Sequence, residues 1–134
     1  MIIWRKEMSV GNPMIDGDHR YLICLINTVE LALSNESYKD VLDTVLDQLD
    51  EYTREHFARE EKLQLELYYL KRDEHAQQHA ELIRELGEIR RKVRSVKEPD
   101  MGKEIAGEIA LLLRHWLIDH ILQRDMLMKP LFGQ

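Results

Sequence analysis

A chain of 134 residues, 44% hydrophobic and 33% charged, has the size and composition of one globular domain and not of a disordered chain. The net charge is −6 and no basic stripe stands out, so we expect no nucleic-acid partner. No apolar run approaches the roughly 20 residues needed to span a bilayer, and the N-terminus lacks the apolar core of a signal peptide. We therefore expect no membrane partner and a cytoplasmic location, which also suits the single cysteine, Cys24.

Residues 1–17 are expected to form an irregular arm. Gly11, Pro13 and Gly17 interrupt any regular pattern there, and Asp16 or Asp18 can cap the helix that follows. This arm precedes the first long stretch with helical periodicity.

Four blocks with apolar residues at three- and four-residue spacing follow the arm, which is the pattern of amphipathic helices that face a common core. Asp100 is expected to cap the fourth helix, and Pro130 to end it. Short connections join antiparallel neighbours. The sequence thus predicts an all-α, up-down-up-down antiparallel four-helix bundle in a single domain over residues 1–134. The predicted helices cover residues 18–34, 38–66, 70–96 and 100–128.

Several polar side chains stand at seam positions where a bundle normally places Leu or Ile. Burying a polar group without a partner costs about 1–3 kcal/mol, so six of them would consume much of a small domain's stability of about 5–15 kcal/mol. A bound metal is the simplest compensation. These residues are His19, His56, Glu60, His75, His79 and His120.

The spacing of these residues supports a shared site. His56 and Glu60 are four residues apart, as are His75 and His79, and such pairs lie only about 40° apart around a helix. From each candidate residue to the next loop, and from that loop to the candidate on the following helix, the rise along the helix axis is about equal. The candidate ligands on all four helices should therefore lie at the same end of the bundle. We therefore expect these donors to converge on one point.

Asp125 is a further candidate ligand, and it does not fit an ideal helix. It follows His120 by five residues, which is about 140° around a regular α-helix. If both residues point inward, the fourth helix must contain a π-bulge or a local distortion between them.

The donor set indicates the class of metal. Five imidazoles and two carboxylates are too many for one zinc ion, which takes four ligands, and they suit two ions such as iron bridged by the carboxylates. The chain contains no Glu-x-x-His motif, which the carboxylate-rich di-iron proteins use twice. Fewer anionic ligands stabilise high-valent iron less, which favours reversible dioxygen binding over oxidation of a substrate.

An ordered set of residues, with one piece on each helix, resembles the hemerythrin and bacteriohemerythrin family over essentially the whole chain. Departures from the family pattern are Asn12 and Met14 in the arm, and Tyr68 and Tyr69 between the second and third helices. The matching residues are Trp4, Val10, Gly11, Pro13, Ile15, Asp16, His19, His56, Phe57, Glu60, Glu61, His75, His79, Trp116, Leu117, His120, Ile121 and Asp125.

The resemblance implies a cofactor of two iron ions (Fe²⁺/Fe³⁺) with a bridging oxo or hydroxo group. Three histidines would hold one iron, two would hold the other and leave one position open for dioxygen, and two carboxylates would bridge the pair. An apolar pocket would surround the open position. The first iron would take His75, His79 and His120, the second His19 and His56; Glu60 and Asp125 would bridge, and Trp116, Leu117 and Ile121 would line the pocket.

The function expected from this resemblance is reversible dioxygen binding for storage, transport or delivery, and not enzymatic turnover. Two alternatives stay open. One is an oxygen- or redox-sensing input domain, attached to or partnered with a signalling or oxygenase protein. The other is a di-iron oxidase or a scavenger of nitric oxide or peroxide. His115, the remaining histidine, is expected off the ligand face, at the surface or between helices.

Overall fold

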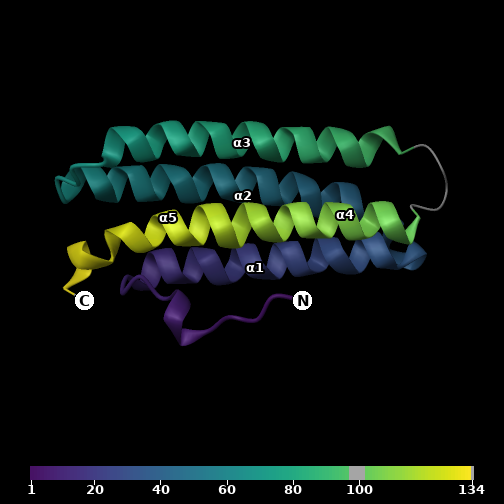
Figure 1. The fold of residues 1–134 in the computed structure, drawn as a ribbon, viewed down its shortest axis with the longest axis horizontal. Coiled ribbons are helices and arrows are strands. Elements are labelled where there is room, and N and C mark those ends of the chain that lie inside the picture. Colours follow the sequence, from purple (N-terminus) through teal and green to yellow (C-terminus); the bar gives the residue numbers. More distant parts are fainter. Residues whose placement is uncertain (97–101, 134) are drawn as a thin grey trace.

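Four long antiparallel rods form the molecule in the computed structural model, which describes residues 1–96 and 102–133. The first three rods are α1, α2 and α3, and the fourth is a continuous succession of four helical segments (Figure 1). The predicted up-down-up-down bundle is therefore confirmed. The bounds are α1 Pro13–Ser34, α2 Lys39–Glu66, α3 Arg72–Ser95, α4 Lys103–Arg114, η3 His115–Leu122, α5 Gln123–Asp125 and η4 Met126–Phe132, with short 3₁₀ turns at η1 Lys6–Met8 and η2 Glu36–Tyr38.

The first helix begins five residues earlier than the expected boundary at residue 18. The Asn12 side chain accepts hydrogen bonds from the backbone N–H groups of Met14 and Ile15, which makes it the N-cap of α1. Pro13 then occupies the first helical position, where a missing N–H is harmless. Pro13 therefore starts the helix, and the prediction that it interrupts regular structure was wrong. The predicted cap of the fourth helix, Asp100, lies outside the described residues.

The N-terminal arm runs back along α1 (Figure 1). The Asn27 side chain accepts from the backbone N–H of Ile2 and donates to its carbonyl, both at 2.8 Å. The Arg20 guanidinium lies 4.8 Å from the ring centre of Trp4. These contacts fix the arm against the bundle although it has little regular structure.

The turn between α2 and α3 is unusual because Tyr68 adopts a left-handed backbone, with φ of 54°. The N–H of Tyr69 donates to the carbonyl of Gln64, and that of Tyr68 to the carbonyl of Leu65, which is a Schellman ending of α2. Glycine normally takes this position because a side chain is strained there. The turn places the metal-ligand candidates of α2 and α3 near the same end of the bundle.

Two apolar cores fill the bundle on either side of a polar layer. The larger core includes Leu22, Leu49 and Leu86. The smaller core comprises Val10, Ile15 and Met128 at the end near the C-terminus. Along α1 and along the fourth rod, the candidate ligands fall between the residues of the two cores. Cys24 is exposed on α1, although cysteine is among the residue types most often buried.

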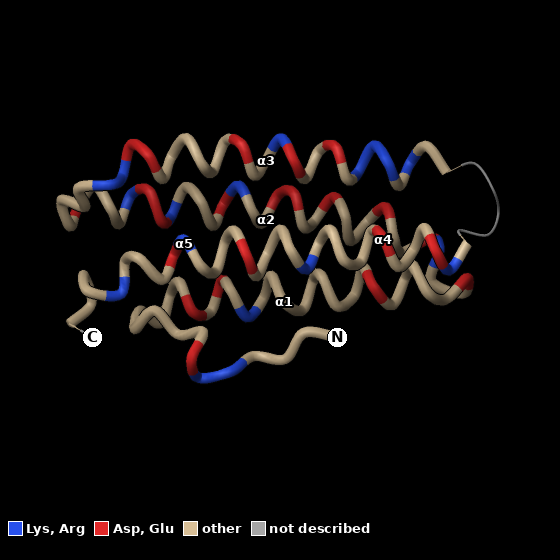
Figure 2. Tube along the Cα trace, in the orientation of Figure 1, with Lys and Arg blue, Asp and Glu red and all other residues tan. Residues whose placement is uncertain are grey.

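Acidic and basic residues are interspersed along the long helices (Figure 2). The most basic stretch lies near the end of α3, and its side chains pair with acids on neighbouring helices. Arg90 and Arg94 both contact Asp47, and Lys92 lies 3.6 Å from Glu108. In the part of the chain that the structure describes, no helix is both long and apolar enough to cross a membrane.

Candidate metal centre

Six side chains with metal-binding atoms meet between the two apolar cores, and we refer to them as the buried cluster. Each is at most 3% exposed, so water cannot satisfy their polar atoms. Every rod contributes at least one of them, which is why no short sequence motif contains the site. The cluster consists of His19 from α1, His56 and Glu60 from α2, His75 and His79 from α3, and Asp125 from α5.

The buried cluster divides into two groups that share their carboxylates. In each group the candidate ligand atoms all lie within 4.8 Å of one another, which is close enough for a single ion to reach every one. The first group is His19, His56, Glu60 and Asp125, and the second is Glu60, His75, His79 and Asp125.

Glu60 turns one oxygen toward each group. Its Oε1 lies 2.8 Å from His75 Nε2 and 3.1 Å from His79 Nε2. Its Oε2 lies 3.1 Å from His56 Nε2 but accepts no hydrogen bond from any described residue. A buried carboxylate oxygen without a donor is costly in a protein interior. A cation between Glu60 and His56 would satisfy that oxygen.

Asp125 has the same arrangement from the opposite side. Its Oδ2 lies 2.6 Å from His19 Nε2 and 3.3 Å from His56 Nε2, while its Oδ1 lies 3.0 Å from His75 Nε2. Both carboxylates therefore present an oxygen to each group. This is the arrangement that two ions bridged by carboxylates require.

Electrostatics holds the two carboxylates ionised. Burial and the nearby Asp125 charge raise the pKa of Glu60, but its close contacts with the imidazoles of His56, His75 and His79 outweigh both and bring it below its ordinary value. Burial likewise raises the pKa of Asp125, and hydrogen bonds from three histidines hold it well below the usual range.

The pKa values of two histidines of the cluster, His75 and His56, are raised and not lowered. Burial lowers the pKa of His75, yet its hydrogen bonds with Asp125 and Glu60 raise it to about 9. The pKa of His56 is likewise raised well above its ordinary value, against the effect of burial, by hydrogen bonds with Asp125, Asp18 and Glu60. Protons on the imidazoles thus balance the carboxylates in the metal-free chain, and bound cations would displace those protons.

A second layer of side chains orients the histidines of the buried cluster. Asp18 accepts from His56 Nδ1 at 2.9 Å, from the hydroxyl of Tyr52 at 2.6 Å, and from both Nε and an Nη of Arg59. A carboxylate on the far ring nitrogen fixes which nitrogen of His56 is free to bind a metal. Asp18 was predicted only as a possible helix cap, a role that Asn12 fills. The stripe of Tyr52, His56 and Arg59 at spacings of four and three residues is a signal that could have revealed this network.

His79 is supported in the same way. Its Nδ1 lies 3.1 Å from Glu61 Oε2, so Glu61 belongs to this second layer. The ring of Phe57 stacks on His79, with the ring centres 3.9 Å apart and the planes 5° apart. The orientation of His79 is thus fixed from two sides.

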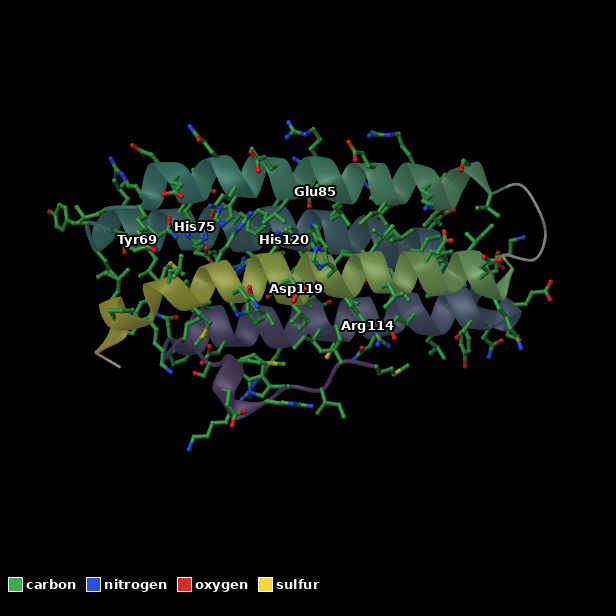
Figure 3. The ribbon with its side chains drawn as sticks, in the orientation of Figure 1. Tyr69, His75, Glu85, Arg114, Asp119 and His120 are labelled. Carbon is green, nitrogen blue, oxygen red and sulfur yellow. The ribbon has the colours of Figure 1, made fainter. Side chains whose placement is uncertain are left out.

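His120 does not join the buried cluster in this structure. Its Nε2 lies 3.2 Å from Nε2 of His115, and its ring lines a surface cavity instead. Figure 3 shows His120 at the fourth rod, farther along the bundle than His75. The structure therefore brings together six of the seven predicted ligands.

The fourth rod carries the backbone distortion that the spacing of His120 and Asp125 predicts. The segment η3, His115–Leu122, is a π-helix between the α-helical segments α4 and α5. It contains His120 and ends three residues before Asp125. A π-helix widens the turn and changes the face on which each following residue lies. Asp125 reaches the buried cluster just beyond this change in helix type.

The predicted pocket residues Trp116, Leu117 and Ile121 are all buried, at 2%, 0% and 1% exposed. They belong to the same apolar core as Phe57, which stacks on His79. The indole N–H of Trp116 donates to the carbonyl of Leu82 at 2.9 Å, which fixes that ring. An apolar wall therefore stands on one side of the buried cluster.

A four-helix bundle with histidines and carboxylates gathered between its rods is the architecture of a metal-binding bundle. A family model described as the hemerythrin HHE cation binding domain matches residues 10–132, and the chain belongs to the hemerythrin family.

Bacteriohemerythrins are among the similar proteins. The chain is 28% identical to the bacteriohemerythrin of Stenotrophomonas maltophilia (strain R551-3), over 93% of this chain and 77% of the relative. It is 31% identical to that of Pseudomonas paraeruginosa over 92% of this chain and 76% of the relative. It is 30% identical to that of Clostridium acetobutylicum over 93% of this chain and 96% of the relative. No solved structure matches the chain.

Proposed function

We propose that this protein holds two iron ions in the buried cluster and binds dioxygen reversibly, for storage, transport or delivery. The observation that carries the proposal is that Glu60 and Asp125 each face both histidine groups. Two cations placed in those groups would share both carboxylates, and each would also take two imidazoles. When bound, such an iron pair supplies the electrons that a dioxygen molecule needs in order to bind.

The choice of iron rests on the chemistry of the donors. Imidazole nitrogens combined with a few carboxylate oxygens suit iron among the divalent ions, whereas magnesium and calcium prefer oxygen ligands only. In the proposed site, His19 and His56 serve one ion, and His75 and His79 serve the other. His120, the seventh ligand that the family resemblance implies, would have to leave His115 before it could join them.

The residues around the cluster favour binding over turnover. Trp116, Leu117 and Ile121 would keep water from the bound gas, and loss of the oxygenated form requires water and protons. Asp18 and Glu61 would hold His56 and His79 in their binding orientation through the far ring nitrogens. The sensing and enzymatic alternatives have no further structural support in the described residues.

The experiment that tests this proposal is a cycle between nitrogen and air. The protein is loaded with ferrous iron without oxygen, and the iron content is measured. Two irons per chain, with a visible absorption band that appears in air and disappears under vacuum over several cycles, are expected. Direct and irreversible oxidation to the ferric form on the first exposure would overturn reversible binding.

A further inference from the structure

The turn between α2 and α3 exposes large apolar side chains at the end of the bundle where the C-terminus also lies (Figure 1). We call three of them, Leu67, Tyr68 and Leu70, the apolar tip; they are 39%, 87% and 99% exposed. Among the described residues, Leu70 and Tyr68 are the two most exposed large apolar side chains. Single apolar residues on a surface are ordinary, but a group of large ones marks a contact site.

The backbone holds Tyr68 of the apolar tip in a strained conformation. Its φ is 54°, in the left-handed region where a Cβ atom is crowded and glycine is favoured. The Tyr68 side chain makes no hydrogen bond or ring contact with any described residue, so the fold of this chain gains nothing from it. Strained backbone of this kind is concentrated at functional sites. A contact outside the chain would account for a tyrosine at this position.

The apolar tip is backed by firm structure. Tyr69, the next residue, packs against the smaller apolar core of Val10, Ile15 and Met128. The N–H of Tyr69 also donates to the carbonyl of Gln64 at 2.9 Å, which fixes the turn. A partner that covers the apolar tip would therefore add buried apolar surface next to an existing core, which is the main driving force of protein association.

Four charged residues follow the apolar tip, two basic and then two acidic, and Figure 2 shows the two colours in succession at the start of α3. All four are exposed. Lys71 and Glu74 make no ion pair with any described residue. In a two-fold contact the same surface of both copies meets, so each residue finds the same partner twice. Antiparallel alignment of the two α3 starts would place Lys71 of each copy against Glu74 of the other. The four are Lys71, Arg72, Asp73 and Glu74.

We propose that the apolar tip is the centre of an interface with a second copy of this chain, and that Lys71 and Glu74 pair across a two-fold axis at its rim. The order of charges favours this occupant because it is complementary to itself. A lipid surface fits less well, since anionic headgroups would repel Asp73, Glu74 and a chain with a net charge of −6. Small interfaces are weak and reversible, so the dimer forms at high protein concentration.

The test is sedimentation equilibrium of the full chain at increasing concentration. The wild type is expected to pass from monomer to dimer in the micromolar range. Leu70→Ser should weaken the dimer by about tenfold or more, as loss of a central interface contact does, and the fold should persist because this side chain is already in solvent. Leu111→Ser, 67% exposed on α4, is the matched control and should dimerise like the wild type. A wild-type chain that stays monomeric throughout would overturn the proposal.

A charge exchange tests the two-fold alignment. Lys71→Glu should weaken the dimer by placing two acidic residues opposite each other. The double variant Lys71→Glu with Glu74→Lys should restore it, because the same pairs form again with their signs exchanged. Circular dichroism confirms that each variant is helical. An unaffected dimer in Lys71→Glu, or no rescue in the double variant, would contradict the alignment.

Tyr68→Gly separates the cost of the strained backbone from its use. Glycine adopts the left-handed conformation without strain, so the monomer should unfold at a higher urea concentration while the dimer becomes weaker. A dimer as tight as that of the wild type would exclude the ring from the interface. Flotation with vesicles of phosphatidylglycerol and phosphatidylcholine examines the lipid alternative. A wild-type chain that floats with them, and that Leu70→Ser releases, would assign the apolar tip to lipid and overturn the proposal.

Discussion

Glu60 and Asp125 face each other across the buried cluster, and each directs one oxygen toward His75 and the other toward His56. The two carboxylates come from α2 and α5, which lie far apart in the sequence. Both are ionised in an interior that would otherwise exclude charge, because histidines surround them. This pair joins two separate histidine groups into one site.

Removal of one bridging carboxylate should therefore lower the occupancy of both ion positions. The Glu60→Gln variant keeps the size of the side chain but loses its charge, and we expect iron content to fall from two ions to one or fewer per chain. Iron analysis after loading and dialysis checks this. Glu51→Gln, an exposed change on the same helix, is the matched control and should retain both ions. Two ions in Glu60→Gln would show that the carboxylate is no bridge.

Asp18 should act on iron through His56. In Asp18→Asn the amide cannot replace the carboxylate that orients His56 Nδ1, so affinity for one of the two ions should fall by about 10–100-fold. Competition with a coloured chelator measures the loss. Tyr52→Phe removes only the hydroxyl contact with Asp18 and should change the affinity much less. Equal losses in the two variants would mean that the network acts as a whole and not through the Asp18 carboxylate.

The stability of the iron-free chain should depend on pH because of His75. Burial lowers its pKa and the two carboxylates raise it, to about 9 in the folded chain, against about 6.5 when unfolded. A raised folded pKa stabilises the fold below about pH 6.5, and this stabilisation is lost as pH rises through about 9. Urea denaturation at several pH values should show the free energy of unfolding decreasing over that interval.

Two comparisons check the origin of this pH dependence. His75→Gln should flatten the decline, since glutamine does not titrate. Bound iron should reverse the decline in the free energy of unfolding, because cations displace the imidazole protons and bind more tightly as pH rises. A decline of the same steepness in His75→Gln would assign the effect to other groups.

Leu117 should protect the bound gas and also stabilise the core. Its side chain is fully buried, so Leu117→Ala should lower the free energy of unfolding by about 2–5 kcal/mol. Iron should stay in place, since Leu117 offers no ligand, but the oxygenated form should decay faster as water enters. The visible spectrum followed over time in air checks this. Leu113→Ala, equally buried one turn earlier, controls for stability alone.

The amino-acid sequence by itself determined the bundle and most of the site. The periodic apolar stripes specify four amphipathic helices, and short turns leave antiparallel packing as the simple solution. Polar residues such as His56 and Glu60 stand out in those stripes because four-residue spacing fixes which face they share. The five-residue step from His120 to Asp125 also indicated a distorted fourth helix if both residues point inward, and a π-helix covers His115–Leu122, although only Asp125 points inward.

Only the tertiary structure decided which side chains meet and in which direction they point. A stripe gives the face of a helix but not the rotation of a ring, so His120 could turn toward Asp125 or, as found, toward His115. The start of α1 depended on a hydrogen bond of the Asn12 side chain, which the residue type allows but does not require. The network of Asp18 with Tyr52, His56 and Arg59 joins two helices, and contacts across helices form only when the rods pack.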